Sequence, residues 1–179
     1  MNSRSFSLRP FAPAGLPPGI KITGSLRRQA DTLALTYLLQ GRLTEVLLPV
    51  PAARPVRRDR LWEETCFEFF LALQDAPQYW EFNLSPAGDW NVFHFTAYRQ
   101  GLAAEPAFSS LPFEVQKRPE ALGLALEVDL ARIVTADQTL EVAVAAVIKA
   151  RDGRISHWAL THPGPRADFH RRDSFILTC

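Results

Sequence analysis

Apolar and polar side chains alternate along most of this sequence, and this period of two constrains the fold more than any other feature. Successive side chains of a β-strand point to opposite faces, so a period of two predicts strands with one apolar face. The clearest segments are "DTLALTYLLQG" (31–41), "CFEFFLAL" (66–73), "GLALEVDL" (123–130) and "TLEVAVAAVIKA" (139–150). Shorter candidate strands lie at 19–26, 45–50, 79–85, 90–95, 111–118, 155–160 and 173–179.

Turn-forming residues separate these segments and suggest how they connect. Asp152-Gly153 is a strong signal for a tight hairpin turn, and Pro86-Ala87-Gly88-Asp89 is expected to join 79–85 to 90–95. Helix evidence is confined to "DLARIVTADQT" (129–139), which could form a single turn at a corner. About ten short strands with little helix predict an all-β fold, a jelly-roll β-sandwich of two mainly antiparallel sheets.

The length and charge of the chain limit its organisation and its partners. With 179 residues we expect one domain over 19–179, preceded by a proline-rich N-terminal arm over 1–18 that packs across a sheet edge. A net charge of +1 gives no basic surface for nucleic acid or for an anionic membrane. The basic cluster within 54–60 is interrupted by Pro55 and Asp59 and is expected to lie in a solvated loop.

No targeting segment is visible in this sequence. No stretch approaches the roughly 20 apolar residues of a membrane span, and the amino end lacks the apolar run of a secretory signal. We therefore predict a cytoplasmic protein. Cys66 and Cys179 do not make a disulfide framework, and both are expected to be unreactive.

A row of polar side chains lies within the aromatic strands of "QYWEFNLSPAGDWNVFHF" (78–95). Glu81, Asn83 and Ser85 are two residues apart and should project from one face, and Glu68 joins them if its strand lies alongside. Carboxylates and amides beside aromatic rings are the groups with which proteins bind sugars. The row is therefore either a recognition surface or an ordinary solvated face.

The segment "WNVFHFTAYR" (90–99) adds Trp90 and Arg99 to the candidate residues. Alternation places Trp90 on the face opposite to Phe93 and Phe95. Arg99 follows the strand and could pair with Glu63 or Glu81, either as a structural ion pair, which we favour slightly, or as part of a ligand clamp.

Histidines gather in "SHWALTHPGPRADFHRRDSF" (156–175), at positions 157, 162 and 170. Their spacing is not a known metal-ligand pattern, so we predict no metal site and expect histidines held by hydrogen bonds in a loop. His162 is retained as a candidate ligand-binding residue.

Three segments together resemble the bacterial DOMON-like proteins related to family 9 carbohydrate-binding modules. They are "LWEETCFEFFLA", "YWEFNLSPAGDWN" and "SHWALTHPGPRADFHRRDSFIL", and the resemblance spans about residues 18–178. It implies a jelly-roll sandwich that binds a ligand and does no chemistry. Sugar-binding members clamp a sugar between two tryptophans, but no pair among the four tryptophans of this chain can be matched to that clamp.

The resemblance also bears on cofactors. Haem-binding DOMON relatives use a methionine as iron ligand, and the only methionine here is Met1, so haem is not expected. Calcium occurs among relatives, but the scattered acidic residues name no calcium site. We therefore expect no cofactor.

The sequence thus predicts non-catalytic binding of a small polar ligand, most simply a carbohydrate, on the concave face of the sandwich. The predicted ligand-binding residues are Trp62, Glu68, Glu81, Asn83, Trp90, Arg99 and His162. One alternative is a module that binds a protein partner or a second copy of itself through exposed tryptophans. A weaker alternative is a glycoside hydrolase with paired carboxylates, although no catalytic sequence motif supports it.

Overall fold

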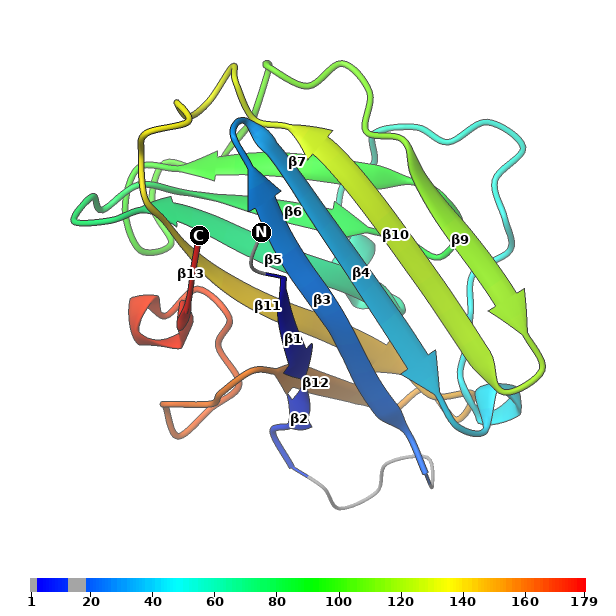
Figure 1. Ribbon diagram of the computed structural model, residues 1–179. Coiled ribbons are helices and arrows are strands. Elements are labelled where there is room, and N and C mark those ends of the chain that lie inside the picture. The colour runs from blue at the N-terminus through cyan, green and yellow to red at the C-terminus, as the bar shows by residue number, and fades with distance from the viewer. Residues whose placement is uncertain (1–2, 13–18) are drawn as a thin grey trace.

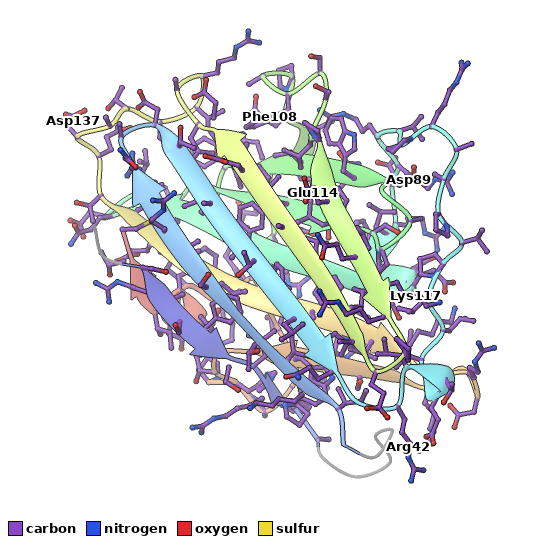
Figure 2. All side chains as sticks on the ribbon, turned by 45° about the vertical axis from the view of Figure 1, so that its right-hand side comes forward. Arg42, Asp89, Phe108, Glu114, Lys117 and Asp137 are labelled. Atoms are coloured by element: carbon purple, nitrogen blue, oxygen red, sulfur yellow. The ribbon has the colours of Figure 1, made fainter. Side chains whose placement is uncertain are left out.

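Two antiparallel sheets lie face to face in the computed structural model, which describes residues 3–12 and 19–179 (Figure 1). The first sheet has five strands in the spatial order β1 (Arg4–Ser7), β3 (Lys21–Gln29), β4 (Thr32–Gln40), β10 (Ala121–Asp129) and β9 (Phe113–Arg118). Its edge strand β9 carries Glu114 and Lys117 (Figure 2). Charges on an edge strand discourage pairing with other sheets.

The second sheet has eight strands and carries the candidate site. Its order is β2 (Arg9–Pro10), β12 (Ile155–Ala159), β11 (Leu140–Lys149), β5 (Cys66–Leu73), β6 (Tyr79–Leu84), β7 (Trp90–Phe95) and β8 (Ala103–Ala104), and β13 (Leu177–Thr178) pairs with β11. Three short 3-10 helices, η1 (Leu43–Glu45), η2 (Leu61–Glu63) and η3 (Arg172–Ser174), lie in the connections. The predicted β-sandwich of two mainly antiparallel sheets is confirmed.

The main core fills the space between the sheets, as the alternation predicts. Leu33, Leu35 and Tyr37 of β4 point inward, and the rings of Phe69 and Phe82 stack at 4.4 Å between centroids on the facing sheet. The Tyr37 hydroxyl donates a 2.6 Å hydrogen bond to the backbone carbonyl of Glu68 and so joins the two sheets. Burial of aromatic and branched side chains in this layer is the main stabilising contribution to the fold.

The eight-stranded sheet is also covered on its outer face, which explains why β5 and β6 are buried along almost their whole length. The chain after β12 folds back over this face, and Phe169 and Phe175 pack against Phe70 at 6.4 and 5.9 Å between ring centroids. We call this second layer the outer-face cluster; it comprises Phe70, Ala72, Tyr79, Phe93, Phe95, Ala143, Ala145, Val147, Ala159, Phe169 and Phe175.

Most predicted elements are present, and two are not. Both predicted hairpins are found, and Gly88 adopts the positive φ of 97° that the β6–β7 turn requires. The strand predicted at 45–50 is wrong: only Val46 forms an isolated bridge, since Pro49 and Pro51 cannot donate to a ladder. The strand predicted at 173–179 is also wrong except at β13, while the single turn predicted within 129–139 is present: the Val134 N–H donates to the Leu130 carbonyl at 3.0 Å. Within the described residues no helix is long and apolar enough to cross a membrane.

The predicted N-terminal arm falls partly outside the described residues, which exclude 1–2 and 13–18. Within the described part, β1 pairs with β3 and forms one edge of the first sheet, and β2 pairs with β12 of the other sheet. This short segment therefore contacts both layers of the sandwich.

One arginine of the basic 54–60 cluster is not solvated as the sequence suggested. The Arg57 guanidinium donates to the Asn91 side chain at 2.9 Å and to the backbone carbonyls of Val92, Glu105 and Phe108. It also lies 4.4 Å from the centre of the Trp90 ring. This side chain fastens the loop that leads into η2 onto β7, so it positions one wall of the candidate site.

We expect Arg57→Lys to lower the free energy of unfolding by about 1–3 kcal/mol, because an ammonium cannot reproduce the planar set of donors. Urea unfolding measures the change. Arg54→Lys is the matched control, because Arg54 is exposed, and it should change stability by less than about 0.5 kcal/mol. Equal stabilities for the two variants would contradict the anchoring role of Arg57.

Candidate ligand-binding site

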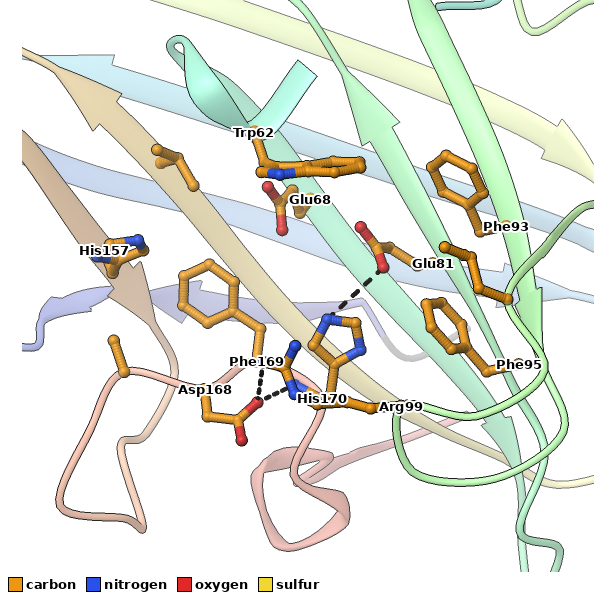
Figure 3. A pocket seen from close by; sticks show the side chains of 13 residues that line it. Trp62, Glu68, Glu81, Phe93, Phe95, Arg99, His157, Asp168, Phe169 and His170 are labelled. Carbon is orange, nitrogen blue, oxygen red and sulfur yellow. Dashed lines mark hydrogen bonds and ion pairs between the residues drawn. The ribbon is translucent and has the colours of Figure 1, made fainter. Parts of the chain in front are cut away.

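A pocket of about 380 Å³ lies on the outer face of the eight-stranded sheet, beside the outer-face cluster. Strands β5, β6, β7, β11 and β12 form its floor and sides, and Trp62, Arg99 and residues 167–170 enclose it from three separate loops (Figure 3). The lining residues are Trp62, Glu68, Glu81, Phe93, Phe95, Arg99, Leu102, Val147, His157, Ala167, Asp168, Phe169 and His170. The volume is in the range of small-molecule sites.

Strand register brings the two glutamates to the floor of this pocket. On β5 and β6, Phe70 pairs with Glu81 and Glu68 pairs with Asn83, so both acids project to the outer face from neighbouring strands. Their sequence neighbours Phe69 and Phe82 point the other way, into the main core. The same alternation that builds the core therefore gives the pocket an acidic floor.

The floor carboxyl groups are buried and unequally satisfied. Glu68 is 3% exposed and Glu81 is 5% exposed. The Asn83 amide donates a 2.8 Å hydrogen bond to Oε1 of Glu81, whereas Oε1 of Glu68 has no hydrogen-bond partner. Burial raises the pKa of Glu81 to about 7, and burial together with the charge of Glu81 raises the pKa of Glu68 well above its ordinary value. The pair therefore favours holding a proton near neutral pH.

A hydrogen-bonded chain beside Glu81 holds the imidazole of His170 in place. The backbone N–H of Arg99 donates to the Tyr79 hydroxyl at 3.2 Å, and that hydroxyl lies 2.8 Å from Nδ1 of His170. Burial raises the pKa of Tyr79 to about 12 and lowers the pKa of His170 to about 4, so both are neutral at pH 7. The hydroxyl and Nδ1 share one hydrogen bond, and Nε2 lies 3.8 Å from Oε2 of Glu81.

The Arg99 guanidinium pairs with Asp168, not with Glu63 or Glu81 as the sequence suggested. Its Nη2 donates to Oδ1 of Asp168 at 2.8 Å, and the Tyr98 hydroxyl donates to Oδ2 of the same carboxylate. Burial alone would raise the pKa of Asp168, but these donors lower it below its ordinary value. Asp168 is thus ionised, and its charge neutralises that of Arg99 at the pocket rim.

Trp62 supplies an exposed aromatic wall. It lies on η2 and is 37% exposed. Arg60, which precedes η2, has a left-handed backbone conformation with a φ of 62°. The Trp62 ring contacts Phe93 edge-on at 6.0 Å between centroids. Trp80, Trp90 and Trp158 are each only 4% exposed, so Trp62 is the indole that a pocket ligand can contact.

The structure brings four of the seven predicted site residues together and leaves three outside the pocket. Trp62, Glu68, Glu81 and Arg99 line it. Asn83 is fully buried and supports Glu81 from behind. Trp90 points into the main core, because β7 turns its other face to the pocket. His162 lies at the far edge of the sheet, with Nε2 2.8 Å from the Arg9 carbonyl oxygen.

Sequence reasoning missed Phe93, Phe95, Asp168, Phe169 and His170 as pocket residues. The signal for Phe93 and Phe95 was present, since they share the strand face opposite to Trp90. Asp168 and His170 come from a loop whose position over β5 and β6 has no sequence signature. Within residues 3–12 and 19–179, no group of three or more His, Cys, Asp or Glu residues could hold a metal ion. The Cys66 thiol is free and buried, and burial raises its pKa well above the ordinary value.

The raised pKa of Glu81 predicts a pH-dependent stability. The folded state keeps a proton that the unfolded state loses above about pH 4.5, so this contribution is complete below pH 4.5 and is lost as the pH rises through about 7. Between pH 5.5 and 8.5 the native protein should lose about 2 kcal/mol of unfolding free energy more than Glu81→Gln, as measured by urea unfolding. The low pKa of His170 acts in the opposite direction but is common to both proteins.

Glu127→Gln is the control for this measurement, since Glu127 is exposed on β10 of the other sheet. It should follow the pH dependence of the unmodified protein. If Glu81→Gln also follows it, Glu81 titrates like an exposed acid and the buried acidic floor is wrong.

Comparison with known proteins places the fold among solved structures. No protein-family model and no curated protein sequence matches this chain. A Bacteroides uniformis protein, provisionally assigned as carbohydrate-binding, matches with a TM-score of 0.73 and 14% identity, over 96% of this chain and 83% of its own. A family 9 carbohydrate-binding module of Caldicellulosiruptor kristjanssonii in complex with glucose matches with a TM-score of 0.54 and 10% identity, over 92% and 78%.

The same module in complex with cellotriose matches with a TM-score of 0.53 and 9% identity, over 90% of this chain and 74% of the other. At sequence identities of 9–14%, these matches show a similar fold and nothing more. The chain therefore shares the β-sandwich fold of these proteins.

Proposed function

We propose that this protein is a non-catalytic carbohydrate-binding domain that holds a sugar in the pocket between Trp62 and the acidic floor. The observation that carries the proposal is the combination of two buried carboxyl groups, Glu68 and Glu81, with one exposed indole around a single cavity. The shared fold with modules crystallised with glucose and cellotriose supports it. We also propose that the chain is related to the DOMON-like proteins, whose sequence motifs it resembles.

The chemistry of the lining suits a sugar ring. Carboxyl oxygens of Glu68 and Glu81 would accept hydrogen bonds from ring hydroxyls, and Asn83 holds the Glu81 carboxyl in place. The C–H face of the ring would pack on Trp62, because indole offers a large, rigid apolar surface. Arg99 keeps its guanidinium at the rim, 51% exposed at the side chain, and can donate to a further hydroxyl.

Calorimetric titration with glucose, cellobiose and other mono- and disaccharides tests this function. We expect binding in the micromolar to millimolar range, and a loss of at least tenfold in Trp62→Ala and in Glu81→Gln. Leu38→Ala is the matched control, because Leu38 is 38% exposed on the other sheet, close to the 37% of Trp62. Failure of every sugar to bind at millimolar concentration would refute carbohydrate binding.

A second candidate, glycoside hydrolysis, is favoured by one observation: two acids with raised pKa values line one pocket. Hydrolysis needs one protonated acid and one ionised carboxylate on either side of the scissile bond. Here both acids project from the same side of the pocket, and both pKa values are raised. This arrangement does not separate a proton donor from an ionised carboxylate, so it suits binding better than hydrolysis. We expect no release of p-nitrophenol from p-nitrophenyl glycosides; turnover that Glu81→Gln abolishes would establish the hydrolase instead.

A further inference from the structure

The negative charge on the pocket floor has no cation paired with it. In the described part of the chain, no lysine or arginine nitrogen lies within 4.0 Å of Glu68 or Glu81. Arg99 binds Asp168, and the Nε2 atom of the neutral His170 is 3.8 Å from Glu81. A pair of buried carboxylates without a counter-charge is unfavourable, so either a proton or a ligand has to neutralise it.

The second observation is the unpartnered oxygen of Glu68. Oε1 is buried and accepts no hydrogen bond, although the Glu68 side chain lines the pocket. Figure 3 shows the carboxyl groups of both glutamates directed toward the space beside Trp62. Buried polar atoms nearly always have a partner in native proteins, so a donor missing at this point is a property expected of the bound ligand.

The remaining walls suit an organic cation. Trp62, Phe93, Phe95 and Phe169 line the same pocket, and the faces of aromatic rings attract ammonium groups. A calcium ion would need six to eight oxygen ligands, which two carboxyl groups do not supply. A neutral hydroxyl would satisfy the unpartnered oxygen but would not replace the proton that the pair holds.

We infer that the ligand carries a protonated amine that seats against Glu68 and Glu81, beneath the Trp62 indole. Since this inference rests on the proposed function, it names the ligand as an amino sugar with a free amino group. The ammonium donates hydrogen bonds to both carboxylates and neutralises part of their charge. The protons bound to the two acids are then released to solvent when the amine binds.

The other titratable groups around the pair do not compete for this role near pH 7. Cys66 and Tyr79 face it from the sheet, and burial raises the pKa of both, so they stay neutral. His157 and His170 face it from β12 and the covering loop, and burial lowers their pKa values. Arg99 and Asp168 neutralise each other. Proton release on binding at pH 7 is therefore assigned to the glutamates.

The test compares D-glucosamine, D-glucose, N-acetyl-D-glucosamine and cyclohexylamine by calorimetry on the unmodified protein at pH 7.0. We expect glucosamine to bind at least tenfold more tightly than glucose and N-acetylglucosamine. At pH 7.0, in two buffers of different ionisation enthalpy, glucosamine should release at least one proton per molecule bound. Glu68→Gln and Glu81→Gln should each reduce the preference for glucosamine, and the exposed control Glu127→Gln should leave it unchanged.

The outcomes separate this inference from the function on which it rests. Equal affinities for glucosamine and glucose would overturn the amine inference and leave carbohydrate binding intact. Binding of cyclohexylamine without any sugar would overturn carbohydrate binding and retain the cation site. No binding by any of the four compounds would overturn the amine inference, and the titration with disaccharides would then decide carbohydrate binding separately. The comparison of ligands on the unmodified protein decides the matter even if a glutamine variant fails to fold.

Discussion

The antiparallel pairing of β5 with β6 is the constraint on which the core and the pocket both depend. In the observed register Phe69 stacks on Phe82 inside the sandwich, and Glu68 and Glu81 stand on the other side of the same two strands. Because side chains alternate, turning either strand over would bury a glutamate in the main core and expose a phenylalanine. The hydrogen bond from Tyr37 to the carbonyl of Glu68 joins this pair to the opposite sheet at the position of the acid.

The acidic pair at the centre of the sheet has raised pKa values because the outer face is partly covered. The segment after β12 covers the apolar half of that face through Phe169 and Phe175, and it brings Asp168 and His170 to the pocket. Burial by this segment raises the pKa of the glutamates, so the covering that stabilises the sheet also creates the electrostatic character of the site.

Much of the fold and about half of the site follow from sequence reasoning, for a physical reason. Strand identity and face are encoded locally by alternation, so Glu68 and Glu81 could be placed on one surface before the structure was known. Trp90 was predicted to bind the ligand, although alternation places it on the strand face opposite to Phe93. The prediction was wrong because it followed the residue type, tryptophan, and ignored the face of the strand. Asn83, expected to meet the ligand, is fully buried. The partnership of Arg99 with Asp168 joins residues 69 positions apart through a loop, and local patterns do not encode it.

Backbone strain offers an independent argument that the pocket is shaped for a purpose. Within the described residues, four non-glycine residues have positive φ, namely Ala30, Arg60, Asp75 and Arg99. Two of these hold pocket walls: Arg60 precedes the turn that presents Trp62, and Arg99 itself lines the cavity. Such conformations cost roughly 1–3 kcal/mol each and persist where surrounding contacts impose them. The Arg99–Asp168 pair, with its largely buried carboxylate, supplies such a contact, so this wall is held in position before a ligand arrives, which reduces the entropy lost on binding.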